Sequence, residues 1–131
     1  QKKPKKTIPE KHTIMVIPRV EQQVLMEKRP PAGIWGGLWC FLEMADISEL
    51  PGLLTKLNLK QTNTFALDKF RHTFSHFHLD IEAIVVDCEM LPAKEICENS
   101  TLQWYNLATV ASVGLAASTQ KLIKQLEQLP V

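Results

Sequence analysis

The sequence predicts an α+β fold, in which one largely antiparallel or mixed sheet is flanked by about two helices. Short runs of β-branched, aromatic and aliphatic residues alternate with turns rich in proline, glycine or polar residues, a pattern typical of strands. Two other segments space apolar residues three or four positions apart, as amphipathic helices do. At 131 residues, with 45% apolar and 22% charged side chains, the chain suffices for one buried core but is short for two.

The strands and loops are predicted from composition and period. Strands are expected at residues 12–17, 24–28, 38–43, 64–74, 76–87 and 101–106. A polar turn joins the first two, and residues 29–37, dense in proline and glycine, form an irregular loop. The fourth and fifth strands meet at Ser75. These two strands are therefore expected to form a hairpin with Ser75 at its tip.

Two helices complete the predicted fold. The first begins at Asp46 or Ser48, where a short polar side chain can cap the helix, and a proline is tolerated in its first turn. The second covers residues 121–129 and is expected to be capped by Ser118 or Thr119.

Cysteine usage and hydropathy exclude several classes of protein. Cys40, Cys88 and Cys97 are odd in number and show no C-x-x-C spacing. This pattern favours reduced thiols in an intracellular protein and argues against a zinc or iron–sulfur site within this chain. No apolar run approaches the roughly 20 residues that a membrane span needs, and no signal peptide opens the sequence. We therefore expect no membrane partner.

Charge is distributed unevenly along the chain. Residues 1–11 carry five lysines and one acid, contain two prolines and resemble a connector arm, although a solvated tail is the alternative. The sequence starts at this arm, which suggests a piece of a longer protein. The other 120 residues carry ten basic and thirteen acidic groups, a net charge of −3. Such a domain is a poor non-specific binder of phosphate backbones, because that binding depends on the density of cations.

A hydrolase signature survives without its metal ligands. Gly37-x5-Glu43, followed by a helix, resembles the start of the Nudix box of diphosphate hydrolases, G-x5-E-x7-R-E-U-x-E-E-x-G-U, where U is aliphatic. Clustered glutamates of that box hold divalent cations against a diphosphate. In this register the ligand and arginine positions are occupied by Pro51, Gly52, Thr55 and Lys56, with Asn58 in place of the glycine, while Leu53 and Leu59 keep the aliphatic positions. We therefore expect a Nudix-like mixed β-sheet without Nudix hydrolysis.

Two longer motifs make the resemblance more specific. RPPAGIWGGLWCF and FRHTFSHFHLDI, together with LQWYNLATVASVGLAASTQKLIKQL near the end, resemble the C-terminal domain of the adenine DNA glycosylases, the MutY family. The basic arm KKPKKTIPE is similar to the connector that follows the catalytic domain in that family. The resemblance thus implies an interdomain connector at 1–11 and a Nudix-like lesion-recognition domain at 12–131.

The family resemblance implies a role in base excision repair. The complete enzyme removes adenine mispaired with 8-oxoguanine, and this domain would recognise the oxidised base in duplex DNA. The catalytic acids and a 4Fe-4S cluster would belong to an N-terminal catalytic domain, the second partner, so that this chain holds no catalytic residue, cofactor or metal. A monomer in the bacterial cytoplasm or nucleoid is expected.

The recognition loop of the family corresponds to Phe74, Ser75 and His76. Oxidation of guanine turns an acceptor on its Hoogsteen edge into a donor and adds a carbonyl acceptor beside it. A serine hydroxyl both donates and accepts, so Ser75 could bond this altered edge. Flanking rings could stack on a base or wedge into the duplex, and could hold it open while adenine is flipped out.

Other residues have structural alternatives. Phe70 and Phe77 are expected in the core, as are Trp39 and Trp104, whereas Trp35 could brace a surface. Zinc bound by His72, His76 and His78 is a minor alternative. Possible contacts to the DNA backbone are Arg29, which could instead form a salt bridge, and Lys2, Lys3, Lys5 and Lys6. At the level of function, the alternatives are a divergent nucleotide diphosphatase and a non-catalytic protein-interaction module.

Overall fold

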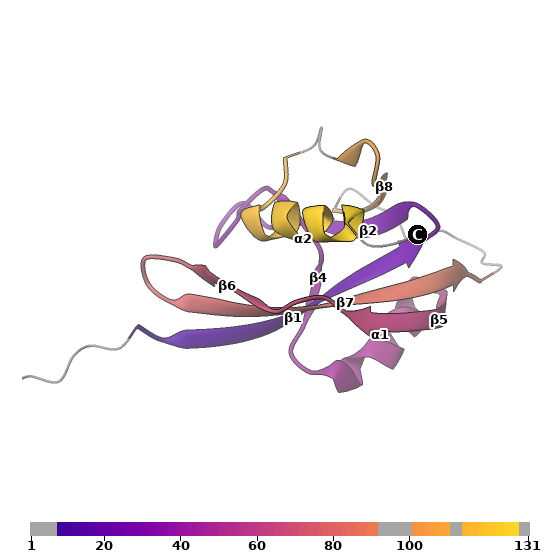
Figure 1. Cartoon of the computed structure of the whole chain (residues 1–131), viewed down its shortest axis with the longest axis horizontal. Helices are drawn as coiled ribbons and strands as arrows, with labels where there is room; N and C mark the ends of the chain where they lie inside the picture. Colours follow the sequence, from indigo (N-terminus) through magenta and orange to yellow (C-terminus); the bar gives the residue numbers. More distant parts are fainter. Residues whose placement is uncertain (1–7, 92–100, 111–113, 129–131) are drawn as a thin grey trace, which may run out of the picture.

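The computed structural model describes residues 8–91, 101–110 and 114–128, and within them it confirms the α+β fold (Figure 1). An eight-stranded sheet has the order β3-β2-β1-β7-β5, with β4 also paired to β1, β6 to β7 and β8 to β2. The strands are β1 Glu10–Val20, β2 Gln23–Lys28, β3 Trp39–Cys40, β4 Leu42–Met44, β5 Leu59–Ala66, β6 Phe70–Thr73, β7 His78–Met90 and β8 Leu102–Asn106. The helices are the 3-10 turn η1 Ile47–Glu49, α1 Leu50–Leu57 and α2 Ala117–Glu127.

The centre of the sheet is the parallel pair β1 and β7, whose registers run from Glu10↔His78 to Arg19↔Asp87. The other strand pairs are antiparallel. Side chains of a strand alternate between its two faces, so this pair contributes to two separate cores. One core lies under α2 and includes Met15, Ile81 and Leu122, and the other lies under α1 and includes Val16 and Leu54. Figure 1 shows the two helices on opposite faces, here called the α2 face and the α1 face.

The predicted continuous strand at 64–74 is wrong. The strand β5 ends at Ala66, and residues 67–69 separate it from β6. Ala66 pairs with Ile84 and Phe70 pairs with Ile81. The chain therefore advances four residues from β5 to β6 while β7 advances only three, which leaves one extra residue on the β5–β6 side. The extra residue forces a detour, in which buried Leu67 donates its backbone N–H to the Ala83 carbonyl at 2.9 Å. The apolar residues change from odd positions (Phe65 and Leu67) to even positions (Phe70 and Phe74) across the detour, and this change of parity is the signal of the extra residue that the strand prediction missed.

The predicted strand at 38–43 is interrupted at Phe41. Its first part, β3, pairs with β2, whereas its second part, β4, pairs with β1. Phe41, only 1% exposed, lies at the change of partner. The apolar run predicted burial correctly, but it contains no signal for the change of neighbour.

The predicted cap of the first helix is confirmed, whereas the predicted caps of the second are wrong. At η1 the Asp46 carboxylate accepts the backbone N–H of Ser48 at 3.1 Å, and Glu49 accepts that of Asp46 at 3.0 Å, which makes a capping box. The expected caps of α2 are wrong, because the helix starts at Ala117 and its N-cap, Ala116, makes no side-chain bond. Ser118 and Thr119 are buried inside the first turn. The predicted end at residue 129 lies outside the described residues.

The first strand starts earlier than expected. Glu10 and Lys11, assigned from the sequence to the connector, pair with His78 and Leu79 of β7. The long β7 supplies backbone partners there, which a sequence pattern cannot reveal. In the described ranges no helix is both long and apolar enough to span a membrane.

Candidate functional site

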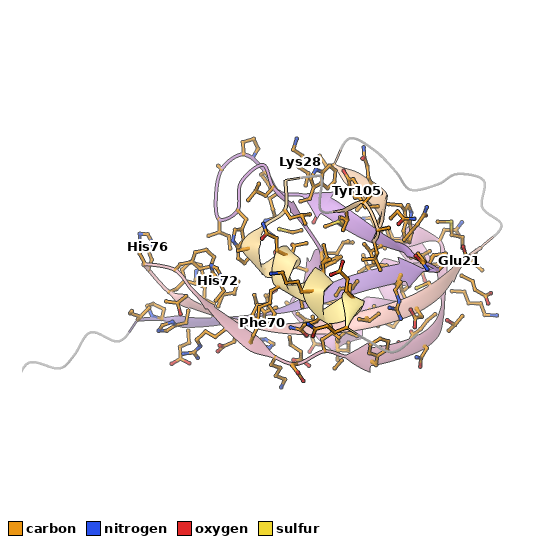
Figure 2. The ribbon with its side chains drawn as sticks, turned by 45° about the horizontal axis from the view of Figure 1, so that its top comes forward. Glu21, Lys28, Phe70, His72, His76 and Tyr105 are labelled. Carbon is orange, nitrogen blue, oxygen red and sulfur yellow. The ribbon has the colours of Figure 1, made fainter. Side chains whose placement is uncertain are left out.

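The β6–β7 hairpin projects from the body of the domain and carries the predicted site at its tip (Figure 1). Thr73 pairs with His78, and beyond this pair the Phe74 N–H donates to the Phe77 carbonyl at 2.8 Å and closes the turn. Ser75 and His76 occupy the turn and are exposed. Figure 2 shows His76 at the outer end, with His72 and Phe70 further back along the arm. The structure therefore places the predicted residues together in a tight, solvent-facing turn.

Phe74 belongs to an aromatic cluster beneath the turn, made of Trp35, His72, Phe74 and Phe77. Its ring stacks on Phe77 at 4.7 Å and lies 4.6 Å from His72 and 5.2 Å from Trp35, measured between ring centroids. Trp35 also meets His72 edge-on at 5.3 Å. All four rings are half-buried. Phe74 is therefore held by neighbouring rings, and the tip rests on a packed aromatic base.

Ser75 and His76 form the polar part of the tip. The Ser75 Oγ and His76 Nδ1 atoms are 2.8 Å apart, and the imidazole tautomer decides which of them donates. Because a hydroxyl has one proton and two lone pairs, Ser75 keeps capacity for a further bond in either case. Thr73 and His78 form a similar pair at 2.9 Å one step down the hairpin.

Charged groups differ between the two faces of the hairpin arm. On the α1 face, Arg71 binds Asp80 through two bonds of 2.6 and 3.0 Å and also binds Glu10 at 2.9 Å. The Arg71 guanidinium lowers the pKa of the Asp80 carboxyl, and bonding to Asp80 raises the pKa of Arg71. On the α2 face, Lys11 lies 4.6 Å above the Phe77 ring, and Lys121 of α2 lies 4.6 Å above the Phe70 ring.

These contacts were not foreseen from the sequence. Arg71 and Glu10, like Lys121 and Phe70, lie far apart along the chain, so no local spacing relates them. Phe70 and Phe77 are half-buried and pack against the core under α2, as expected. Trp39 and Trp104 lie half-buried in β3 and β8 and also pack on the cores.

The three clustered histidines have separate environments. His72 belongs to the aromatic cluster, His76 contacts Ser75, and His78 contacts Thr73. Among the described residues no three histidine, cysteine or acidic side chains are placed to hold a metal ion. Cys40 and Cys88 are buried, and burial raises the pKa of each thiol to about 11. Both thiols are therefore protonated at neutral pH and are poor nucleophiles and metal ligands.

Glu43, the glutamate of the residual Nudix box, is occupied by protein partners. Arg29 donates to one carboxylate oxygen, and the Thr13 hydroxyl donates to the other at 2.8 Å. The side chains of Arg29 and Glu43 are 22% and 27% exposed. The salt-bridge alternative for Arg29 is therefore confirmed. The other candidate backbone contacts, Lys2, Lys3, Lys5 and Lys6, lie outside the described residues.

The remaining ligand positions of the box lie on α1. Pro51, Gly52, Thr55 and Lys56 are all exposed, and none bears a carboxylate. The buried side of the helix is formed by Leu50, Leu54 and Leu57. The helix thus keeps its packing positions and presents no acidic cluster to solvent.

Sequence comparison identifies the family. The model of the NUDIX domain matches residues 13–125. The chain is 27% identical over 128 residues, 98% of its length, to the adenine DNA glycosylase of Buchnera aphidicola subsp. Baizongia pistaciae. It is 30% identical over 125 residues, 94% of its length, to that of Buchnera aphidicola subsp. Schizaphis graminum. These matches cover 36% and 35% of the two relatives, so the chain spans about a third of their length.

Comparison with solved structures supports the fold. The C-terminal domain of mouse MUTYH, solved in complex with human PCNA, superposes with a TM-score of 0.64 at 16% identity. The match covers 88% of this chain and 86% of that one. The chain therefore belongs to the NUDIX domain family, and the resemblance of its motifs to the adenine DNA glycosylases is confirmed.

Proposed function

We propose that this chain is the lesion-recognition domain of an adenine DNA glycosylase and reads 8-oxoguanine opposite a mispaired adenine during base excision repair. The observation that carries the proposal is the exposed Ser75 hydroxyl, held at a closed turn above the aromatic cluster. The similarity to adenine DNA glycosylases over nearly the whole chain supports it. In this proposal the catalytic acids and a 4Fe-4S cluster belong to a separate N-terminal domain.

The pair of Ser75 and His76 suits the altered edge of the oxidised base. If Ser75 donates to His76 Nδ1, its oxygen can accept the new N–H of 8-oxoguanine. If His76 donates to Ser75, the hydroxyl proton is free to bond the new carbonyl. Unmodified guanine carries an acceptor nitrogen in place of the new N–H and a C–H in place of the new carbonyl. Each hydrogen-bonding state therefore has a partner atom on the oxidised edge, and the first has none on normal guanine.

Phe74 acts as a support in this proposal. Its ring already contacts Phe77, His72 and Trp35, so wedging it into a duplex would disrupt three ring contacts. The exposed His76 ring is better placed to stack on a base, an interaction worth about 1–3 kcal/mol. In this proposal Ser75 and His76 contact the lesion, and Phe74 holds these two residues in place.

The charge of the domain limits its role to selection of the base. Residues 12–131 carry a net charge of −3, so this part of the chain gains little binding energy from attraction to DNA phosphates. Most of the affinity for duplex DNA is therefore assigned to the catalytic domain, with Lys2, Lys3, Lys5 and Lys6 as further candidates. On this proposal the domain works as a monomer beside that partner.

The test is the Ser75→Ala substitution in the complete glycosylase. A lost hydrogen bond to a base edge is worth about 1–3 kcal/mol, so the preference for adenine opposite 8-oxoguanine over adenine opposite guanine should fall by a factor between about 5 and 150. Single-turnover rates of adenine release on the two duplexes measure this preference. Thr55→Ala, which removes an exposed hydroxyl on α1, is the control and should change neither rate. Unchanged discrimination after Phe74, Ser75 and His76 are all replaced by alanine would refute the proposal.

Two alternative functions make different predictions. A nucleotide diphosphatase would release pyrophosphate from nucleoside triphosphates in a magnesium-dependent reaction. We expect none, because Glu43 is paired and the α1 positions bear no carboxylate. A protein-interaction module would bind its partner equally well before and after the Ser75→Ala substitution.

A further inference from the structure

Trp35 reaches the hairpin tip from a distant loop. It lies half-buried between residues 29 and 37, and its ring contacts both Phe74 and His72 of the arm. Within the aromatic cluster, Phe77 and His72 belong to the same hairpin as Phe74, so they move with it. Trp35 is the member of the cluster that ties the tip to another part of the fold.

The loop holds Trp35 in an unusual backbone conformation. Trp35 has φ of 54°, in the left-handed region that bulky side chains seldom adopt. The next residue, Gly36, lies so close to the Pro31 carbonyl that an added Cβ would be 2.3 Å from its oxygen. Gly37, with φ of 75°, donates its N–H to the Arg29 and Pro30 carbonyls at 3.1 Å. Surrounding contacts therefore impose this conformation, as is common where a site needs a fixed side chain.

The residual hydrolase box anchors this loop. The Arg29 N–H donates to the Leu38 carbonyl at 2.9 Å and closes the loop at its base. The Arg29 side chain in turn binds Glu43, which Thr13 of the central strand also binds. A continuous set of contacts thus runs from the central sheet through Glu43 and Arg29 to the loop that carries Trp35.

We propose that Trp35 is a positioning residue for lesion recognition: it fixes the Phe74 ring and thereby the location of Ser75 and His76. The inference rests on the proposed function and adds a specificity determinant outside the recognition loop. Without the Trp35 ring the hairpin still closes, because the backbone bond between Phe74 and Phe77 and their stacking remain. One side of Phe74 then loses its support, and the tip gains freedom to turn away from the base.

The experiment compares Trp35→Leu with Trp35→Phe in the complete glycosylase. Leucine keeps an apolar side chain in the loop but cannot stack, and phenylalanine restores a ring. Trp35→Leu should lower the preference for adenine opposite 8-oxoguanine over adenine opposite guanine on the order of fivefold, which is the scale of one aromatic contact. The rate of adenine release opposite guanine should stay unchanged. Trp35→Phe should recover most of the preference for adenine opposite 8-oxoguanine.

Trp39→Leu is the matched control. Trp39 is also half-buried and meets a ring edge-on, Tyr105 at 5.1 Å, and this partner ring belongs to β8 and not to the aromatic cluster beneath the tip. Trp39→Leu should lower the melting temperature about as much as Trp35→Leu does. It should leave the preference for adenine opposite 8-oxoguanine unchanged. A change in preference equal to that of Trp35→Leu would overturn the inference, because general loosening of the domain would then explain both.

A combined variant separates this inference from the proposed function. If Trp35 acts through Ser75 and His76, then adding Trp35→Leu to the variant with both Ser75→Ala and His76→Ala should lower the preference no further. Additive losses, or a normal preference in Trp35→Leu while Ser75→Ala is impaired, would refute the role of Trp35 and leave the proposed function standing. A normal preference in Ser75→Ala would refute the proposed function itself.

Discussion

The residual hydrolase box and the hairpin tip use their polar side chains in opposite ways. In the box, Glu43 is half-buried and bound by Arg29 and Thr13, so its hydrogen-bonding capacity is directed into the fold. At the tip, Ser75 and His76 are exposed and bond each other, so capacity for a ligand remains. The box has become a structural contact, whereas the tip keeps hydrogen-bonding capacity at the surface, as the proposed function requires.

If the proposed function holds, the difference explains how a NUDIX fold can carry a new site and keep its framework. Loss of the acidic side chains leaves α1 packed on its core through Leu50, Leu54 and Leu57. The glutamate that remains helps to hold the loop of Trp35, on which the tip rests. The comparison predicts that substitutions in the box lower the stability of the fold. It also predicts that replacing the polar side chains at the tip weakens recognition of the base.

The largest effect on stability is expected for Arg29→Ala. It leaves the half-buried Glu43 carboxylate with one partner fewer, which should cost about 2 kcal/mol of unfolding free energy. Urea denaturation measures the change. Glu43→Gln on the Arg29→Ala background should recover part of the loss, because it removes the unpaired charge. If the double variant is instead less stable than Arg29→Ala, the assigned role of this ion pair is wrong.

A smaller, pH-dependent effect is expected on the hairpin arm. Arg71 lowers the pKa of Asp80 in the folded protein, so Asp80 takes up protons more readily when the chain is unfolded. Its contribution to stability is therefore present above the unfolded pKa of about 4 and is lost as the pH falls through the lower folded value. Melting temperatures between pH 7 and pH 2 should fall less steeply for Asp80→Asn than for the native chain. Asp68→Asn, in the exposed part of the 67–69 detour, is the control and should keep the native slope.

The smallest effect on stability is expected at the tip. Ser75→Ala removes an exposed hydroxyl whose bond is to the neighbouring His76, so the unfolding free energy should change by less than about 0.5 kcal/mol. The same urea denaturation used for Arg29→Ala provides the measurement. A loss as large as that of Arg29→Ala would remove the contrast between the two regions, because Ser75 would then support the fold.

Local patterns in the sequence predicted much of the molecule. The α+β class, the helix start at Asp46 and the turn at Ser75 each depend on spacing within a few residues. The absence of carboxylates at Pro51, Gly52, Thr55 and Lys56 is also a property of the sequence alone. The same kind of pattern also predicts helix caps at Ser118 and Thr119, because hydroxyl side chains near a helix start favour capping, but both residues are buried inside the first turn.

Only the tertiary structure decided how these parts support one another. The detour at 67–69 depends on the register of β7, and the ion pair of Arg29 with Glu43 joins a loop to a different strand. The contact between Trp35 and Phe74 likewise unites segments that the sequence presents separately. Sequence determines which chemical groups are available and their local conformation, because these depend on neighbouring residues. Packing between distant segments decides which group supports which, and in this protein that packing holds the turn of Phe74, Ser75 and His76 in a fixed position.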